Sequence, residues 1–290
     1  DEFGGQLIPP YDQELVDEVT NNVNEILTIP LYEAENSGLV VFLEDTVDDA
    51  FHRAVIRTSL SKARNVKIVF TPLHGTGLSS VWPVLKVMGF DVKLDLKTSY
   101  LSGAFENVTF QIPNPEVVQY FDTALELANT VDADIILSSD PDADRMGVMV
   151  KHNGEYEFLN GNGIGILLTG YSINKLAGQN KITADSVIVK TLVTTSLIEI
   201  IARANKVKCI GDLLVGFKYI GAEMNKMYAE NTIAGFIMGT EESHGFLTGD
   251  YCRDKDAACA AVRLAEFAAE MKDFGGTLVD ALDQLYARYG

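Results

Sequence analysis

The sequence predicts an α/β protein made of two α/β/α sandwich domains, each with a mixed, mostly parallel sheet. The first observation is alternation: from residue 47 onward, short apolar segments of strand length alternate with longer segments of helical periodicity. The second is length, because 290 residues suggest about two domains at roughly 150 residues each. Strands that alternate with helices in this way form parallel or mixed sheets covered by helices.

Residues 1–44 lead into the first of these domains. Glycines and prolines predict a loop at 4–10, and apolar residues with helical spacing predict a helix at 12–27, which Pro30 closes. A short strand is expected at 38–43.

The first domain is expected to span residues 45–154, and the second residues 155–290. Between them lies a predicted hairpin that turns at Asn153-Gly154, a pair favoured in two-residue hairpin turns. The expected elements of the first domain and the hairpin are helices at 47–63, 78–88 and 115–128, and strands at 66–70, 91–96, 134–137, 146–150 and 156–159. Those of the second domain are helices at 161–175, 194–204, 216–228, 257–272 and 278–289, and strands at 187–190, 206–210 and 233–238.

The charge balance restricts the partners. With 23 basic and 41 acidic residues the chain has a net charge of −18, which repels nucleic acid and anionic membrane surfaces. An anionic small substrate would need a locally positive pocket or a bound cation. The three cysteines (Cys209, Cys252 and Cys259) form no CxxC pair and fit a reducing compartment. Without an apolar run of 18 residues or a signal-peptide pattern, a cytoplasmic protein is expected.

The strongest local motif is the acidic loop at 140–145. Asp140, Asp142 and Asp144 follow an apolar strand, and their spacing in an extended segment would place three carboxylates on one side. Like charges this close repel unless a cation neutralises them, and carboxylate oxygens suit Mg²⁺ or Ca²⁺. Arg145 beside them is suited to binding a phosphate oxygen. The alternative is a solvated acidic turn with Arg145 as its counter-charge.

A calcium EF-hand is excluded at this loop. Arg145 stands where the EF-hand requires glycine, and Lys151 stands where it requires a bidentate glutamate.

Two further loops follow predicted strands, where chemistry collects in such folds. The loop at 239–245 contains Glu241, Glu242 and Ser243 between glycines, which could bind vicinal sugar hydroxyls or simply cap a helix. The loop at 72–77 places His74 among glycines before a helix, either to bind phosphate or to pack.

Together these motifs resemble the α-D-phosphohexomutase superfamily, the phosphoglucomutases and phosphomannomutases. The family's metal loop has the form DxDxDR, matched at 140–145, and its sugar-selecting loop has the form GxEES, matched at 239–243. Further stretches look like family segments in the family's order: 5–10, 70–77, 190–195 and 216–220.

The resemblance implies an activity and a site. Family members interconvert hexose 1-phosphate and hexose 6-phosphate, of glucose or mannose, through a phosphoserine and a bisphosphate intermediate. The implied site comprises Mg²⁺ on Asp140, Asp142 and Asp144, catalytic roles for Arg145 and Lys255, and substrate contacts from Glu241, Ser243 and Gly216.

The resemblance also implies that the chain is partial. Family members have four domains, of which the first carries a TxSHNP-type serine loop and the fourth an RxSGTxP-type phosphate loop. Neither motif occurs in the 290 residues, which look like domains two and three with a tail of domain one at 1–44. The chain alone is therefore expected to be inactive, with domains one and four of the same parent as its partners. A non-catalytic metal- or sugar-phosphate-binding module and a phosphatase using an aspartate of the acidic loop are the alternatives.

Overall fold

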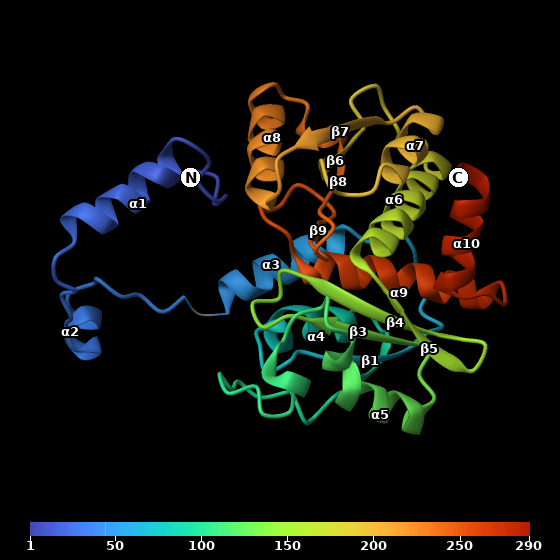
Figure 1. Cartoon of the computed structure of the whole chain (residues 1–290), viewed down its shortest axis with the longest axis horizontal. Helices are drawn as coiled ribbons and strands as arrows, with labels where there is room; N and C mark the ends of the chain where they lie inside the picture. The colour runs from blue at the N-terminus through green and yellow to red at the C-terminus, as the bar shows by residue number, and fades with distance from the viewer. Residues whose placement is uncertain (44) are drawn as a thin grey trace.

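A computed structural model describes residues 1–43 and 45–290 and contains two mixed sheets (Figure 1). The first sheet has five strands in the order β2-β1-β3-β4-β5. Their bounds are Lys67–Thr71 (β1), Asp91–Leu94 (β2), Ile135–Ser139 (β3), Met146–His152 (β4) and Glu155–Leu159 (β5). β1 runs parallel to β2 and β3, whereas β4 runs antiparallel to β3 and β5.

The second sheet has four strands in the order β7-β6-β8-β9. Their bounds are Val187–Thr191 (β6), Lys208–Leu213 (β7), Phe236–Thr240 (β8) and Phe246–Leu247 (β9). β6 is parallel to β7 and β8, and β9 is antiparallel to β8. The predicted mixed, mostly parallel pattern therefore describes the second sheet, while the hairpin leaves the first with equal numbers of parallel and antiparallel pairs.

Both faces of the first sheet are covered. Side chains alternate along each strand, so that Ile68 and Phe70 of β1 face one apolar cluster and Val69 faces another. The first cluster contains α3 (Thr46–Arg57) and α4 (Gly77–Val87), and the second contains α5 (Asp122–Val131). Two short 3₁₀ turns, η1 (Thr109–Gln111) and η2 (Val118–Phe121), precede α5. The predicted α/β/α sandwich is confirmed here.

Helices also cover the second sheet. They are α6 (Gly161–Gly178), α7 (Leu197–Ala204) and α8 (Phe217–Ala229), with a 3₁₀ turn η3 (Ile233–Gly235) before β8. A further helix, α10 (Leu278–Tyr289), packs on α6 and α7. Figure 1 shows α8 on one side of the sheet and α6, α7 and α10 on the other.

The helix α9 (Ala257–Asp273) connects the two units. It follows the second sheet in the chain, yet it packs against α4 and against β3 and β4 of the first sheet. Twelve of its 17 residues are buried, and seven of these twelve are alanine, which permits close approach of neighbouring elements. One apolar cluster consequently runs through both units.

The first residues of the N-terminal segment contact the second unit, and the segment then loops away from both units (Figure 1). The Phe3 ring packs edge-on against Tyr228, and Lys218 Nζ donates to Asp12 Oδ2 (2.8 Å). The segment forms α1 (Tyr11–Asn22) and α2 (Leu31–Asn36). The helix expected at 12–27 ends at Asn22, and the strand expected at 38–43 is wrong, because this segment pairs with neither sheet. Its apolar residues are largely exposed, Ile26 by 86%. Apolar periodicity alone does not extend a helix when no surface covers the apolar face.

Other element ends differ from their predicted positions for local reasons. The helix expected at 47–63 ends at Arg57, and the backbone N–H of Leu60 then donates to the Glu266 carboxylate on α9 (2.9 Å). Lys206 adopts a left-handed conformation (φ 60°), so that β7 begins two residues later than expected. The expected domain boundary after residue 154 falls inside the β4–β5 hairpin, and β5 remains part of the first sheet.

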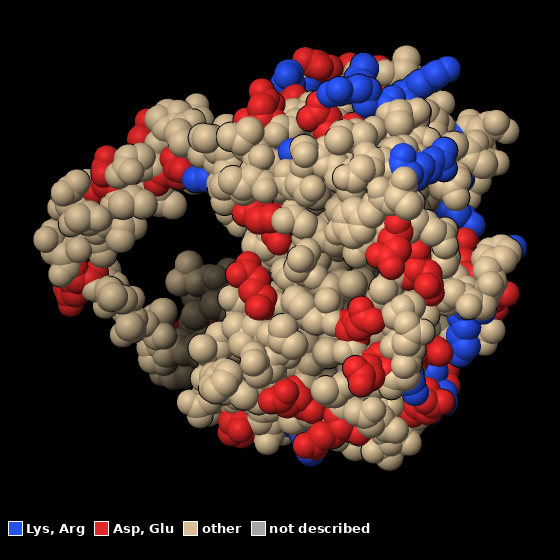
Figure 2. All heavy atoms as spheres, turned by 45° about the vertical axis from the view of Figure 1, so that its right-hand side comes forward, with Lys and Arg blue, Asp and Glu red and all other residues tan. Residues whose placement is uncertain are grey.

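Charge is unevenly distributed over the surface. Figure 2 shows acidic residues across the middle and lower part of one side, with basic residues gathered along its top and right. Among residues 1–43 and 45–290, no helix combines the length and apolar character needed to cross a bilayer.

Candidate active site

Three loops from the two units meet at one place. The loop after β3 (140–145) lies against the loop between β8 and β9 (241–245), where Arg145 and Gly245 form an isolated antiparallel bridge. The N–H of Met146 donates to the carbonyl of His244 (3.0 Å). The N–H of Ala257, at the start of α9, donates to the carbonyl of Ala143 (3.0 Å). Backbone hydrogen bonds thus hold together segments about a hundred residues apart in the chain.

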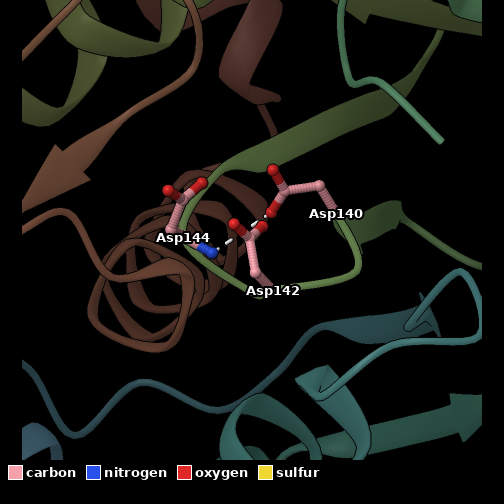
Figure 3. A group of neighbouring side chains, drawn as sticks. All are labelled: Asp140, Asp142 and Asp144. Carbon is pink, nitrogen blue, oxygen red and sulfur yellow. Dashed lines mark hydrogen bonds between the residues drawn. The ribbon is translucent and has the colours of Figure 1, made fainter. Parts of the chain in front are cut away.

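The three aspartates gather on one side of their loop (Figure 3). Each offers a carboxylate oxygen, and these oxygens lie within 4.8 Å of one another. The extended conformation expected for this segment is wrong, because the loop turns at Pro141–Asp142 and Ala143 has a positive φ of 56°. The buried Asp140 carboxylate organises the turn by accepting the N–H groups of Asp144 (3.1 Å) and Arg145 (3.0 Å).

Burial and crowding raise the pKa of Asp140. Burial is the largest cause, and the charges of Asp144 and Asp142 act in the same direction, against the hydrogen bond and charge of Arg145. Arg145 Nε donates to Asp140 Oδ2 (2.6 Å), and Lys255 Nζ lies 2.8 Å from Asp144 Oδ2. Two basic side chains therefore offset part of the acidic charge.

The cluster has the donors that a hard divalent cation needs. Asp144 Oδ1 is buried and has no hydrogen-bond partner among the described residues. Asp142 is exposed and its carboxylate points toward the other two. Carboxylate oxygens at this spacing fit Mg²⁺, which takes such ligands together with substrate phosphate oxygens.

The Glu241 carboxylate lies beside the aspartates. Glu241 is 5% exposed, and burial raises its pKa against the lowering effect of Lys255. A Cβ at Gly245 would collide with both the Glu241 and the Lys255 side chains, which places these two side chains next to each other. Ser243 is half-buried in the same loop. The site therefore combines a buried acceptor and a hydroxyl with the aspartate cluster.

Lys255 is held between the two units. Its side chain is 13% exposed, and its Nζ lies 5.9 Å from the centroid of the Phe217 ring. Burial lowers the pKa of Lys255, but the hydrogen bond to Asp144 and the Asp144 charge raise it overall, so that the amine is protonated. Gly216, with a positive φ of 118°, directly precedes Phe217.

Three interactions had no local signal in the sequence. Asn114 Oδ1 accepts a hydrogen bond from Arg145 Nη1 (3.2 Å), which fixes the guanidinium from a distant loop. Glu242 accepts hydrogen bonds from Thr191 (2.8 Å) and Thr194 (3.2 Å). These contacts depend on tertiary packing, which residue spacing does not reveal.

The loop after β1 has a packing role. The His74 imidazole stacks edge-on against Tyr100 (4.6 Å between ring centroids), and its Nδ1 donates to the Tyr100 carbonyl (2.9 Å). The N–H of Thr76 donates to the carbonyl of Pro141 (2.8 Å), so this loop is hydrogen-bonded to the aspartate loop.

His244 makes the fold sensitive to acid. Its ring is 2% exposed, and burial lowers its pKa to about 4. The unfolded chain binds a proton near the ordinary histidine pKa of 6.5, so this contribution to stability is complete above that pH and is lost as pH falls toward 4. Relative to His244→Asn, we expect the free energy of unfolding to fall by about 3 kcal/mol from pH 7 to pH 4.

Urea denaturation of both proteins at the two pH values measures this difference. Asparagine is suitable because it tolerates the positive φ of 68° at this position. An identical pH dependence in the two proteins would contradict the prediction.

The fold and the site together define a class: an α/β protein with a carboxylate cluster and two basic side chains at the carboxyl ends of its strands. The family models for phosphoglucomutase/phosphomannomutase α/β/α domains II and III match residues 48–154 and 160–289. The chain belongs to the phosphoglucomutase/phosphomannomutase family, and the resemblance seen in the sequence is confirmed.

Curated relatives carry the name phosphoglucomutase. That of Staphylococcus aureus strain MRSA252 is 32% identical over 286 residues, which cover 98% of this chain and 49% of the relative. That of Staphylococcus epidermidis strain ATCC 35984 is 32% identical over 266 residues, covering 91% and 47%. The chain spans about half the length of the curated relatives it matches.

Solved structures share the fold. A phosphoglucomutase/phosphomannomutase family protein from Burkholderia thailandensis has a TM-score of 0.65 at 16% identity, covering 88% of this chain and 51% of that one. N-acetylphosphoglucosamine mutase from Aspergillus fumigatus, solved in complex with GlcNAc-6P and magnesium, has a TM-score of 0.51 at 15% identity, covering 83% and 52%.

Proposed function

We propose that this chain is the central part of a phosphohexomutase that interconverts the 1-phosphate and 6-phosphate of glucose or mannose. Membership of the family and the names of the curated relatives support this activity. The observation that carries the proposal is the bridge between Arg145 and Gly245, which joins the aspartate loop of one unit to the Glu-Glu-Ser loop of the other. In the proposed reaction, a phosphoserine outside this chain donates its phosphoryl group, and a hexose bisphosphate is the intermediate.

We assign Mg²⁺ binding to Asp140, Asp142 and Asp144. Their converging oxygens support this assignment, as does Asp144 Oδ1, which accepts no hydrogen bond among the described residues and lies 3.6 Å from Arg145 Nε. The magnesium in the Aspergillus fumigatus mutase complex supports it as well. When bound, the ion supplies positive charge that stabilises the phosphoryl oxygens during transfer.

Arg145 and Lys255 are proposed to act on the moving groups. The Arg145 guanidinium is oriented by Asp140 and Asn114, which leaves its remaining N–H groups to donate to phosphoryl oxygens. Lys255 is a protonated amine next to Glu241, so it can donate a proton to a leaving sugar oxygen and accept one from an attacking hydroxyl.

Glu241, Ser243 and Gly216 are proposed to bind the substrate. The Glu241 carboxylate and the Ser243 hydroxyl can accept hydrogen bonds from neighbouring sugar hydroxyls in either orientation of the hexose. Gly216, at the start of α8, would allow close approach of the sugar phosphate to the backbone.

The chain is proposed to comprise parts of three domains of its parent. Residues 1–44 would be the tail of the first domain, and the two central domains would be those expected at 45–154 and 155–290. The serine loop and the second phosphate loop would come from domains one and four of the parent. Three free thiols support a reducing, cytoplasmic location.

A coupled assay tests the function. The protein encoded by the complete reading frame is expected to convert glucose 1-phosphate to glucose 6-phosphate with Mg²⁺ and trace glucose 1,6-bisphosphate, whereas the 290-residue chain is not. In the complete protein, Lys255→Met should lower kcat by about 10²- to 10⁴-fold because proton transfer is lost. Lys272→Met, which removes an ion pair with Asp134 instead, is the matched control.

Two results would overturn the proposal. A complete protein inactive on both glucose and mannose phosphates would exclude the assigned activity. Turnover of glucose 1-phosphate by the 290-residue chain would show that the chain does not need a serine loop from another domain.

A further inference from the structure

A cavity lies at the amino-terminal ends of β6 and β8, whereas the active site lies at the carboxyl end of β8. It has a volume of about 260 Å³ and is lined by the first residues of β8, by Ser186 before β6, and by residues at the end of α3. Its charged lining residues are Arg57, Lys181 and Arg263, and none is acidic. The lining therefore has only basic charged residues, although the chain as a whole has 41 acidic and 23 basic residues.

The guanidinium of Arg263 is buried beside this cavity and has no ion-pair partner among the described residues. Arg263 is 4% exposed and lies on α9. Its Nη1 donates to Ser172 Oγ (3.1 Å) and its Nη2 donates to the Thr58 carbonyl (2.8 Å). Its Nε has no acceptor, and no carboxylate among the described residues lies within ion-pair distance. A buried charge without a counter-charge is costly in free energy.

Burial lowers the pKa of Arg263 overall, and the charge of the neighbouring Glu266 offsets only part of this effect. Glu266 lies one turn further along α9, but its oxygens accept hydrogen bonds from Ser59 and from the N–H of Leu60. The same carboxylate also lies 3.6 Å from Arg64. Glu266 therefore already has its own partners on the segment after α3.

Hydroxyl groups of the same lining complete a set of donors. Thr248 is fully buried, and its Oγ1 has no partner within the described part of the chain. Ser186 is 3% exposed, and its Oγ accepts the N–H of Thr183 (2.9 Å), which leaves the hydroxyl proton able to donate. Arg57 and Lys181 are exposed and supply positive charge on the solvent side of the cavity.

We propose that this cavity binds a phosphate group, either as inorganic phosphate or as a phosphate monoester. A tetrahedral oxyanion accepts several hydrogen bonds at once and would pair with Arg263 Nε, the Thr248 hydroxyl and the Ser186 hydroxyl. Water would satisfy the hydroxyls but not the buried positive charge. Because the lining combines the end of α3 with β8 and α9, a bound phosphate stabilises the contact between the two units.

Calorimetric titration of the 290-residue chain with inorganic phosphate, against potassium chloride at equal ionic strength, tests the proposal. We expect one saturable phosphate site that chloride does not occupy. Thr248→Val and Lys181→Gln should each weaken binding by ~tenfold, because each removes a donor or a charge while keeping most of the side-chain volume. Thr169→Val, equally buried on α6, and Lys62→Gln, equally exposed, are the matched controls.

Arg145→Gln separates this cavity from the active site. Binding that survives Arg145→Gln but weakens in Thr248→Val supports the cavity, whatever the fate of the proposed mutase activity. Tighter binding of glucose 6-phosphate than of inorganic phosphate to Arg145→Gln would identify a monoester as the ligand, and weaker binding would identify the free ion. The proposal is overturned if phosphate shows no saturable binding, if chloride binds equally well, or if both cavity variants bind like the unmodified chain.

Discussion

Asp142→Asn is expected to weaken Mg²⁺ binding by the chain at least ~100-fold and to lower the mutase activity of the complete protein by ~10³-fold. Asp142 is exposed, and it contributes one of three carboxylate oxygens that lie within 4.8 Å of one another. The substitution removes one negative charge and one ligand atom while it keeps the side-chain shape. Isothermal titration with MgCl₂ and the coupled assay measure the two effects.

Asp283→Asn is the matched control, because Asp283 is an exposed aspartate on α10. It should leave both quantities unchanged. Equal Mg²⁺ affinity in Asp142→Asn and the unmodified chain would exclude this aspartate as a ligand, and unchanged mutase activity would remove the metal loop from the mechanism.

Gly75→Ala is expected to destabilise the fold by about 3 kcal/mol and to weaken Mg²⁺ binding as well. A Cβ at Gly75 would overlap the backbone of Pro141, and backbone cannot move aside as the end of a flexible side chain can. The loop after β1 and the aspartate loop would have to separate, which would break the hydrogen bond from Thr76 to Pro141 and displace Asp140. Urea denaturation and magnesium titration report the two consequences.

Gly103→Ala provides the comparison, since a Cβ at Gly103 has no neighbour within 4 Å. It should change the stability by less than about 0.5 kcal/mol. A Gly75→Ala protein as stable as Gly103→Ala would show that the aspartate loop does not depend on the loop beneath it.

The positions of the reacting groups along the chain could be predicted because they follow buried strands. β3 and β8 each begin with three apolar residues and are buried along their whole length, so the loops after them emerge at the carboxyl ends of buried strands. The conformation of the aspartate loop could not be predicted in the same way. Its carboxylates converge because Ala143 adopts a positive φ and Asp140 caps two N–H groups, and neither property is visible in the spacing of the residues.

Contacts between the units were beyond prediction for a different reason. The two-residue strand β9 is too short to show a pattern, yet it brings Gly245 to Arg145. Asn114 reaches Arg145 from a loop without regular structure. At the N-terminus a strand was predicted that does not form. Apolar residues at 38–43 indicated a strand, but this segment pairs with neither sheet.

The placement of α9 has a consequence for any attempt to divide the molecule. The helix α9 covers part of the first sheet, but it begins about a hundred residues after β5, the last strand of that sheet. A gene segment that ends after β5 would therefore lack this helix. A truncated product ending after the hairpin would expose Ile135 and Leu137 to solvent and would be prone to aggregation. Because one apolar cluster runs through both halves, we expect them to unfold together rather than as independent modules.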